Sequence, residues 1–196
     1  MIRQGDVYYA WATDPTVRGA GTCGGFVTGI LIHLLESGMV DVVVGVKTGA
    51  DIYDTTLAIM ETPETVRFSA GTLYCGTLLV AKLLIRYLEG NAGKKVAVVV
   101  KGCDAKAIIE MSKRNRIDLD DIILIGLTCS GTISPINVRE MTTQMFGIDP
   151  DDVTGIELSH GQCILRHSGG KKGIPIEDLE KEGYGRRPCC QRCLTR

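Results

Sequence analysis

Apolar runs and amphipathic segments alternate along the first three quarters of the chain. Near-continuous runs of apolar, largely β-branched residues predict strands buried on both faces, at 40–46, 95–100 and 122–127. Segments with helical spacing of apolar residues separate these runs, and we expect helices at about 25–36, 71–88, 104–114 and 136–146. This alternation predicts an α/β fold with a mostly parallel sheet flanked by helices.

The two ends of the chain depart from this alternation. The run Val7–Trp11 is rich in aromatic residues and predicts an additional first strand. Past Asp149 and Pro150 the pattern predicts a small antiparallel hairpin, a glycine- and lysine-rich loop and a short acidic helix, at 154–158 with 162–166, 168–173 and 176–182. We therefore expect an α/β domain over 1–150 and a hairpin with a terminal segment over 151–196.

Composition and charge narrow the class of protein. Of the 196 residues, 44% are hydrophobic and 23% are charged, as in an ordinary globular protein. Lys and Arg number 22 against 23 Asp and Glu, a net charge of −1 that argues against nucleic acid as the main partner. No apolar run approaches the roughly 18 residues of a membrane span, and the N-terminus lacks the apolar core of a secretory signal. We expect a cytoplasmic location, where eight cysteines indicate metal binding or redox chemistry rather than disulfides.

Four cysteines have positions typical of metal ligands. Cys103 follows one predicted strand in VAVVVKGCDA, and Cys129 follows the next in DIILIGLTCSG. Cys190 and Cys193 form a C-x-x-C pair in PCCQRC. Because loops at the carboxyl edge of a parallel sheet lie close together, these thiolates can converge on one centre. Four sulfur ligands suit an iron–sulfur cluster or zinc, although any single cysteine is more often only a small buried hydrophobe.

Three neighbouring features qualify this set. Lys101 and the predicted helix start beside Cys103 are expected to lower the pKa of its thiol and favour the thiolate. Cys189 is adjacent to Cys190, and spacing alone does not decide which of them is a ligand. Cys75 lies within a predicted apolar helix and is interpreted as a core residue.

Two glycine-containing segments are suited to an anionic ligand. GAGTCGG at 19–25 precedes a predicted helix, and RFSAGT at 67–72 is expected to open the second long helix. Helix starts offer unpaired backbone N–H groups to a phosphate or carboxylate. Alternatively, Thr22 simply caps its helix and Arg67 is solvated.

Taken together, these motifs resemble those of the beta subunits of coenzyme F420-dependent hydrogenases and formate dehydrogenases of methanogenic archaea. The matching segments run in order along almost the whole chain: CGGFVTGIL, RFSAGTLY, VVVKGCDAKAIIE, IGLTCSGT and RRPCCQRC. The sequences of the segments CDAKAIIE and GLTCSG resemble the formate dehydrogenase branch more closely than the hydrogenase branch.

The resemblance implies a redox subunit that passes electrons through a [4Fe-4S] cluster and FAD to coenzyme F420, a deazaflavin. The partner would be the separate catalytic alpha subunit of formate dehydrogenase, or the other hydrogenase subunits. The cluster ligands would be Cys103, Cys129, Cys190 and Cys193. We expect the cofactor-binding residues of the first domain to be Gly24, Gly25, Thr28, Ser69, Gly71, Thr72 and Lys101, because two helix starts aimed at one point can share a pyrophosphate.

Other readings of the same residues stay open. They are an F420-reducing hydrogenase beta subunit, a zinc-binding docking module without turnover, and a thiol redox protein that uses Cys190 and Cys193. Family members continue well past the C-x-x-C pair, whereas this sequence stops at Arg196. We therefore interpret it as a truncated form, a piece of a split subunit or a shorter relative, and do not assume that it binds FAD or turns over alone.

Overall fold

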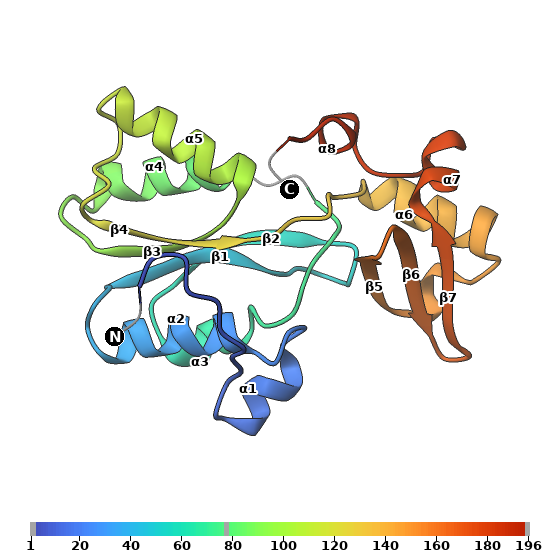
Figure 1. The fold of residues 1–196 in the computed structure, drawn as a ribbon, viewed down its shortest axis with the longest axis horizontal. Helices are drawn as coiled ribbons and strands as arrows, with labels where there is room; N and C mark the ends of the chain where they lie inside the picture. The colour runs from blue at the N-terminus through green and yellow to red at the C-terminus, as the bar shows by residue number, and fades with distance from the viewer. Residues whose placement is uncertain (1–2, 77–78, 195–196) are drawn as a thin grey trace.

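The computed structural model describes residues 3–76 and 79–194, which form two separate β-sheets (Figure 1). The first sheet has the order β2 (Thr55–Met60), β1 (Val42–Thr48), β3 (Val96–Lys101), β4 (Ile122–Leu127). β1, β3 and β4 run parallel, and β2 pairs antiparallel with β1 at one edge. Together with the helices this confirms the predicted α/β class with a mostly parallel sheet.

Helices cover both faces of the first sheet (Figure 1). On one side lie α1 (Pro15–Ala20), α2 (Phe26–Glu36) and α3 (Pro63–Arg67), and on the other α4 (Val80–Gly90) and α5 (Gly102–Lys113). Val43 packs into the core with α2, whereas Val42 and Val44 pack into the core with α4 and α5. All three valines are fully buried, which explains why the strand has no polar alternation.

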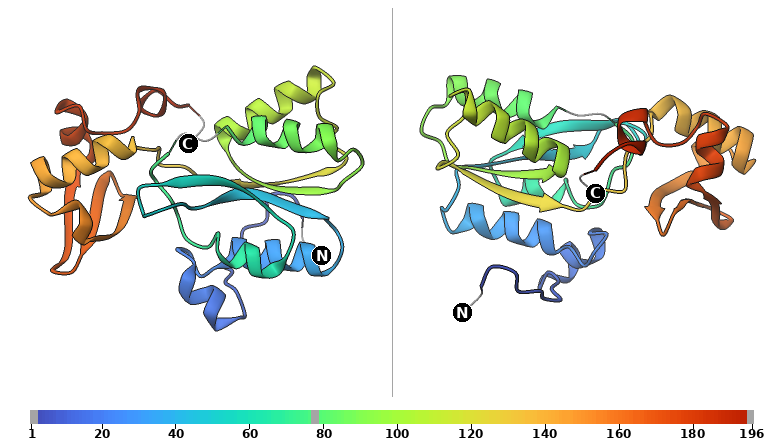
Figure 2. Two further views of the ribbon diagram at one scale, coloured as in Figure 1. Left: turned by 180° about the vertical axis from the view of Figure 1, so that it is seen from behind. Right: turned by 45° about the horizontal axis from the view of Figure 1, so that its top comes forward.

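The second sheet is antiparallel and consists of β5 (Val153–Ser159), β6 (Gln162–His167) and β7 (Gly170–Pro175). Its core is shared with α6 (Pro135–Met141), the π-helical turn Thr142–Phe146 and α7 (Ile176–Lys181). A 3-10 turn, Pro150–Asp152, leads into β5, and α8 (Pro188–Gln191) follows α7. The right-hand view of Figure 2 places α8 beside the carboxyl end of β4. The domain boundary at residue 150 stays a prediction.

Several predicted elements differ from the structure. Residues 7–11 form no strand, and Tyr9 is 100% exposed, because no neighbouring strand pairs with this segment. The second long helix begins at Val80 and not at Gly71; residues 71–76 are irregular apart from a bridge of Cys75 to Ile133, and residues 77–78 of the prediction lie outside the described residues. The edge strands β2 and β7 were not predicted, since both carry polar or glycine residues and pair along one side only.

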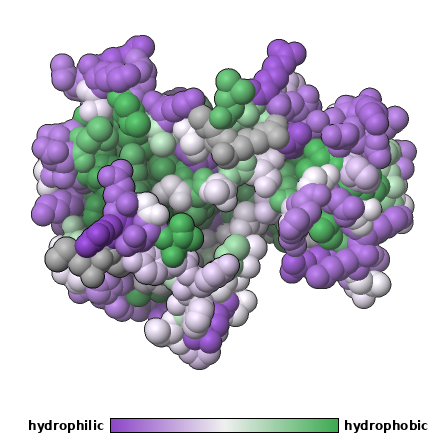
Figure 3. All heavy atoms as spheres, viewed as in Figure 1, coloured by the Kyte–Doolittle hydropathy of each residue, from purple (hydrophilic) through white to green (hydrophobic). Residues whose placement is uncertain are grey.

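β4 forms the other edge of the first sheet. Figure 3 shows apolar residues gathered on the viewed face, where β4 and α5 lie, and Leu127 and Ile109 are among the exposed large apolar side chains. Within the described ranges, no helix combines the length and apolar character that crossing a bilayer requires.

Candidate cofactor site

Five cysteines line one cavity of about 250 Å³ at the carboxyl edge of the first sheet. β3 and β4 end side by side, with Lys101 paired to Leu127, so the loops that follow them emerge together. Cys103 lies in the first turn of α5, and Cys129 lies two residues past β4. The remaining three come from the C-terminal segment around α8: Cys189, Cys190 and Cys193. The structure therefore brings together all four predicted ligands, along with Cys189.

The C-terminal segment is attached directly to the loop after β4. The backbone N–H of Arg187 donates to the carbonyl of Thr132 at 3.0 Å, and Thr132 Oγ1 lies 3.7 Å from Cys190 Sγ. Gly131 makes this approach feasible, because a Cβ there would lie 2.6 Å from Arg186 Cδ and 3.3 Å from Cys190 Cβ. Its φ of +109° is also one that L residues rarely adopt.

The donor set of this cavity consists of thiols, which as thiolates are ligands suited to an iron–sulfur cluster or to zinc. Among residues 3–76 and 79–194, no three His, Cys, Asp or Glu side chains are grouped closely enough to hold one metal ion. In a four-iron cluster each thiolate binds a different iron, so the ligands stand further apart. Soft thiolates from three segments around one cavity are compatible with that arrangement.

The electrostatics of Cys103 contradict the prediction made for its thiol. Partial desolvation, followed by the Asp104 carboxylate, raises the pKa of Cys103, and Lys101 only partly opposes this. Lys101 Nζ lies 2.5 Å from Asp104 Oδ2, and Asp104 is only 6% exposed. The prediction of a lowered pKa is wrong because the positive charge beside the thiol is already paired with a carboxylate.

The two buried cysteines outside this cavity are core residues. Burial raises the pKa of Cys75 to about 12 and that of Cys163 to about 12. Both belong to the core beneath the second sheet. Cys75 is thus a core residue as expected, although in an extended segment and not in a helix.

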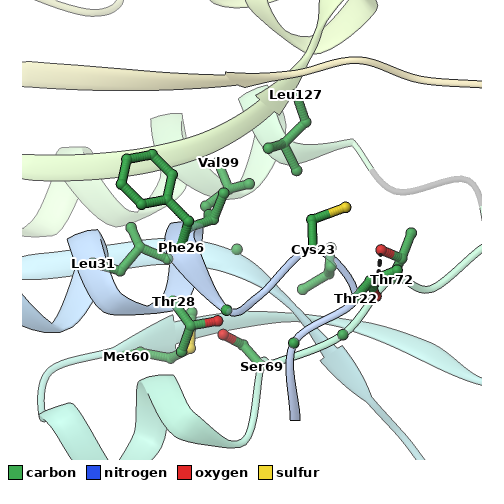
Figure 4. A pocket seen from close by; sticks show the side chains of 16 residues that line it. Thr22, Cys23, Phe26, Thr28, Leu31, Met60, Ser69, Thr72, Val99 and Leu127 are labelled. Carbon is green, nitrogen blue, oxygen red and sulfur yellow. Dashed lines mark hydrogen bonds between the residues drawn. The ribbon is translucent and has the colours of Figure 1, made fainter. Parts of the chain in front are cut away.

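A second cavity, of about 170 Å³, lies between the glycine segment and the loop after α3 (Figure 4). Five of the predicted cofactor-binding residues line it: Gly25, Thr28, Ser69, Gly71 and Thr72. Thr72 Oγ1 donates to Thr22 Oγ1 at 2.9 Å and joins the two loops. Gly24 is not among the lining residues; a Cβ there would lie 2.9 Å from Trp11 Cβ.

The predicted cofactor-binding residues come together at this cavity for a different reason from the one predicted. Only the start of α2 lies at this cavity, with Gly25 as its N-cap at φ +65°. Ser69, Gly71 and Thr72 lie in a loop, because α3 has ended at Arg67 and α4 begins at Val80. The idea of two helix starts sharing one ligand is therefore wrong. Gly25 is required at its position, since a Cβ would lie 2.3 Å from the carbonyl oxygen of Val17.

A central cavity of about 310 Å³ lies between the other two and shares lining residues with each. It shares Thr22, Cys23, Gly71 and Thr72 with the glycine cavity, and Lys101, Cys129, Gly131 and Thr132 with the cysteine cavity. Lys101 lies at the junction with the cysteine cavity and does not line the glycine cavity. Sequence reasoning missed Cys23 and Tyr74 as lining residues; Cys23 lies within the quoted glycine segment, whereas nothing in the local pattern marks Tyr74.

Comparisons with known proteins identify the family. The family model for the N-terminal part of the coenzyme F420 hydrogenase/dehydrogenase beta subunit matches residues 7–85, and the model for the C-terminal part of the same protein matches residues 93–196. The chain belongs to the coenzyme F420 hydrogenase/dehydrogenase beta subunit family. The resemblance seen in the motifs is confirmed.

Individual members of this beta subunit family give the degree of similarity. The chain is 39% identical over 189 residues to the F420-dependent formate dehydrogenase 1 subunit beta of Methanococcus maripaludis, covering 96% of this chain and 48% of that protein. It is 40% identical over 183 residues to the F420-dependent formate dehydrogenase subunit beta of Methanocaldococcus jannaschii, covering 93% and 48%. The chain thus spans about half the length of these relatives.

A solved structure shares the fold of this family member. A chain of the F420-reducing [NiFe] hydrogenase complex from Methanosarcina barkeri superposes with a TM-score of 0.81 at 20% identity, over 94% of this chain and 64% of that chain. At this identity the likeness concerns the fold alone.

Proposed function

We propose that this chain is an electron-transfer part of an F420-dependent formate dehydrogenase beta subunit, with a [4Fe-4S] cluster and FAD as cofactors and coenzyme F420 as electron acceptor. One observation carries the proposal. The central cavity shares lining residues both with the cavity lined by cysteines and with the cavity lined by glycines and hydroxyls, so the three cavities are neighbours. An electron carrier bound in the cysteine cavity would therefore lie close to one bound in the glycine cavity.

Cys103, Cys129, Cys190 and Cys193 would hold the cluster. Cys189 lines the same cavity, so it remains the alternative to Cys190. Cys190 is preferred because its thiol lies beside Thr132 and its Cβ lies close to Gly131. Both residues belong to the loop that carries Cys129.

The flavin would extend through the glycine and central cavities. The glycine cavity alone, at about 170 Å³, is too small for FAD, since ligand pockets usually measure some 300–1,000 Å³. The N–H groups at the start of α2 and the hydroxyls of Ser69 and Thr72 are suited to phosphate, and Phe26, Val99 and Leu127 offer apolar surface. Lys101, paired with Asp104, lines the central cavity and is the cofactor-binding residue proposed there. When bound, the cluster supplies one-electron transfer and the flavin couples it to two-electron chemistry.

The catalytic alpha subunit of formate dehydrogenase is the partner that we propose. The identity of 39–40% to two formate dehydrogenase beta subunits supports this branch over an F420-reducing hydrogenase. The cytoplasmic location stays a prediction.

The test is an anaerobic ultraviolet–visible spectrum of the purified chain with iron, sulfide and flavin analysis. We expect about four irons and four sulfides per chain, with broad visible absorption that bleaches on reduction. FAD analysis is carried out on the chain alone and on a version extended to the length of its relatives. A colourless protein that contains zinc would favour the docking module instead.

A further inference from the structure

Arg187 is the residue at which the C-terminal segment is fixed to the loop after β4. Its backbone N–H donates to the carbonyl of Thr132 at 3.0 Å. Its own carbonyl accepts from the N–H groups of Cys190 at 2.8 Å and Gln191 at 3.0 Å, in α8. Thr132 lines both the cysteine cavity and the central cavity. All of these bonds use backbone atoms, so the attachment does not need the side chain of Arg187.

The guanidinium of Arg187 is not balanced by a carboxylate. Arg187 is half-buried, and its Nε is buried without a hydrogen-bond partner among the described residues. Within the same residues no carboxylate forms an ion pair with it, whereas the neighbouring Arg186 donates from Nε to Glu180 Oε1 at 2.6 Å. A positive charge held partly out of water costs stability unless an anion compensates it. The position of Arg187 therefore indicates an anionic partner that the described side chains do not supply.

The charge of Arg187 acts on the wall between the cysteine cavity and the central cavity. Burial, followed by the Asp51 carboxylate, raises the pKa of Cys75 to about 12, and the positive charge of Arg187 opposes this rise. Cys75 lines the central cavity, and the next residue, Gly76, lines both cavities. Arg187 itself lines neither of them, so its guanidinium acts from behind the wall.

We propose that the Arg187 guanidinium is the counter-charge of the thiolate centre in the cysteine cavity and raises the reduction potential of that centre. A cluster held by four thiolates has a net negative charge, which grows when the cluster accepts an electron. A fixed positive charge nearby stabilises the reduced form more than the oxidised form. The inference rests on the proposed function for the identity of the centre as a cluster. The counter-charge itself applies to any anionic thiolate centre in this cavity.

The test compares the cluster-loaded wild-type chain with Arg187→Met, Arg187→Lys and Arg192→Met. Methionine removes the charge and keeps an unbranched side chain, lysine keeps the charge, and Arg192 is an exposed arginine of the same segment. The midpoint potential is measured by anaerobic redox titration followed by visible absorption, with iron content as the loading control. We expect a more negative potential for Arg187→Met and a potential near that of wild type for Arg187→Lys. We expect no shift for Arg192→Met, because its exposed charge is screened.

Thermal unfolding of the metal-free, reduced chain separates this electrostatic role from a structural one. Without the anionic centre the charge of Arg187 is uncompensated, so Arg187→Met should have the Tm of wild type or a higher one. A lower Tm for Arg187→Met would show that the side chain supports the fold, and would overturn the inference. A potential of Arg187→Met equal to that of wild type would overturn it as well.

If Arg187→Met takes up no iron, Arg187→Lys decides the question. Iron uptake by Arg187→Lys with a wild-type potential supports the counter-charge, whereas a shifted potential or the loss of iron from both variants refutes it. If the wild-type chain itself takes up no cluster, the proposed function fails. Zn²⁺ binding is then titrated, because a zinc centre with four thiolates is also anionic. Weaker Zn²⁺ binding by Arg187→Met, but not by Arg192→Met, supports the counter-charge without that function; equal binding, or no Zn²⁺ binding by the wild-type chain, refutes it.

Discussion

Thr132 Oγ1 and Cys190 Sγ lie 3.7 Å apart, although 58 residues separate them in the chain. This contact brings the C-x-x-C segment onto the loop that follows β4. The N–H of Arg187 reinforces the contact by donating to the carbonyl of Thr132. The cysteine cavity is therefore assembled from segments that are far apart in the chain, and its shape depends on this attachment.

The cysteine series tests the proposed ligands. Changing Cys103, Cys129, Cys190 or Cys193 singly to Ala should lower cluster iron, because water replaces a thiolate poorly. Cys75→Ala should leave the iron unchanged and cost only packing, on the order of 1 kcal/mol. Iron analysis and thermal unfolding are measured on each variant.

Cys189→Ala is the discriminating control for the series. If it strips the iron while Cys190→Ala does not, Cys189 is the ligand and the cluster proposal survives. If neither Cys103→Ala nor Cys129→Ala changes the iron, the four-cysteine assignment is wrong.

Gly131→Ala should detach the C-terminal segment. The new methyl group would lie 2.6 Å from Arg186 Cδ, in a backbone conformation with φ +109°. Gly93→Ala is the matched control, since it also has a positive φ, +78°, but has no atom within 4 Å of its Cβ position. We expect a lower Tm for both variants, because a residue with a Cβ in a positive-φ conformation costs about 1–2 kcal/mol of stability. For Gly131→Ala alone we expect a further decrease in Tm, from the steric clash, and a lower iron content. Equal behaviour of the two variants would show that the close approach is unimportant.

Asp104→Asn should make the Cys103 thiol more reactive. The Asp104 carboxylate is one of the causes that raise the pKa of Cys103, and its loss also releases the Lys101 ammonium. The pKa should fall, so the thiolate fraction at pH 8 rises. The rate of iodoacetamide modification of Cys103, followed by peptide mass spectrometry in metal-free reduced protein, is expected to increase, with exposed Cys189 as internal control. An unchanged or slower rate would contradict the electrostatic explanation.

Asp14→Ala should remove a pH-dependent part of the stability. Asp14 accepts from Thr16 N–H at the start of α1 and forms an ion pair with Arg67 at 2.8 Å. The Arg67 guanidinium, followed by the Thr16 N–H, holds the pKa of Asp14 below its ordinary value of 3.8. A lowered pKa stabilises the fold above pH 3.8 and loses that effect as pH falls through the folded value. The Tm difference between wild type and Asp14→Ala should therefore be present at pH 7 and narrow below pH 3.8; a difference independent of pH would exclude the carboxylate as its cause.

The local sequence by itself determined those strands and helices whose pattern of apolar residues follows directly from how they are buried. β4 has the predicted bounds, Ile122–Leu127, and α2 lies within one residue of its prediction, because a strand buried on both faces and a helix with a glycine N-cap leave clear patterns. The cysteines after β3 and β4 were likewise found from the sequence, since parallel strands deliver their loops to one edge.

Tertiary structure alone decided where pairing partners exist. Val7–Trp11 has strand-forming residues but no neighbouring strand, whereas β7 has a weak pattern and forms because β6 offers it an edge. Tertiary structure also decided that Lys101 is paired with Asp104, which reversed the expected pKa shift of Cys103. Hydrogen-bond partners, ion pairs and desolvation depend on residues distant in sequence, so the spacing of residues along the chain predicts which groups are present but not what they face.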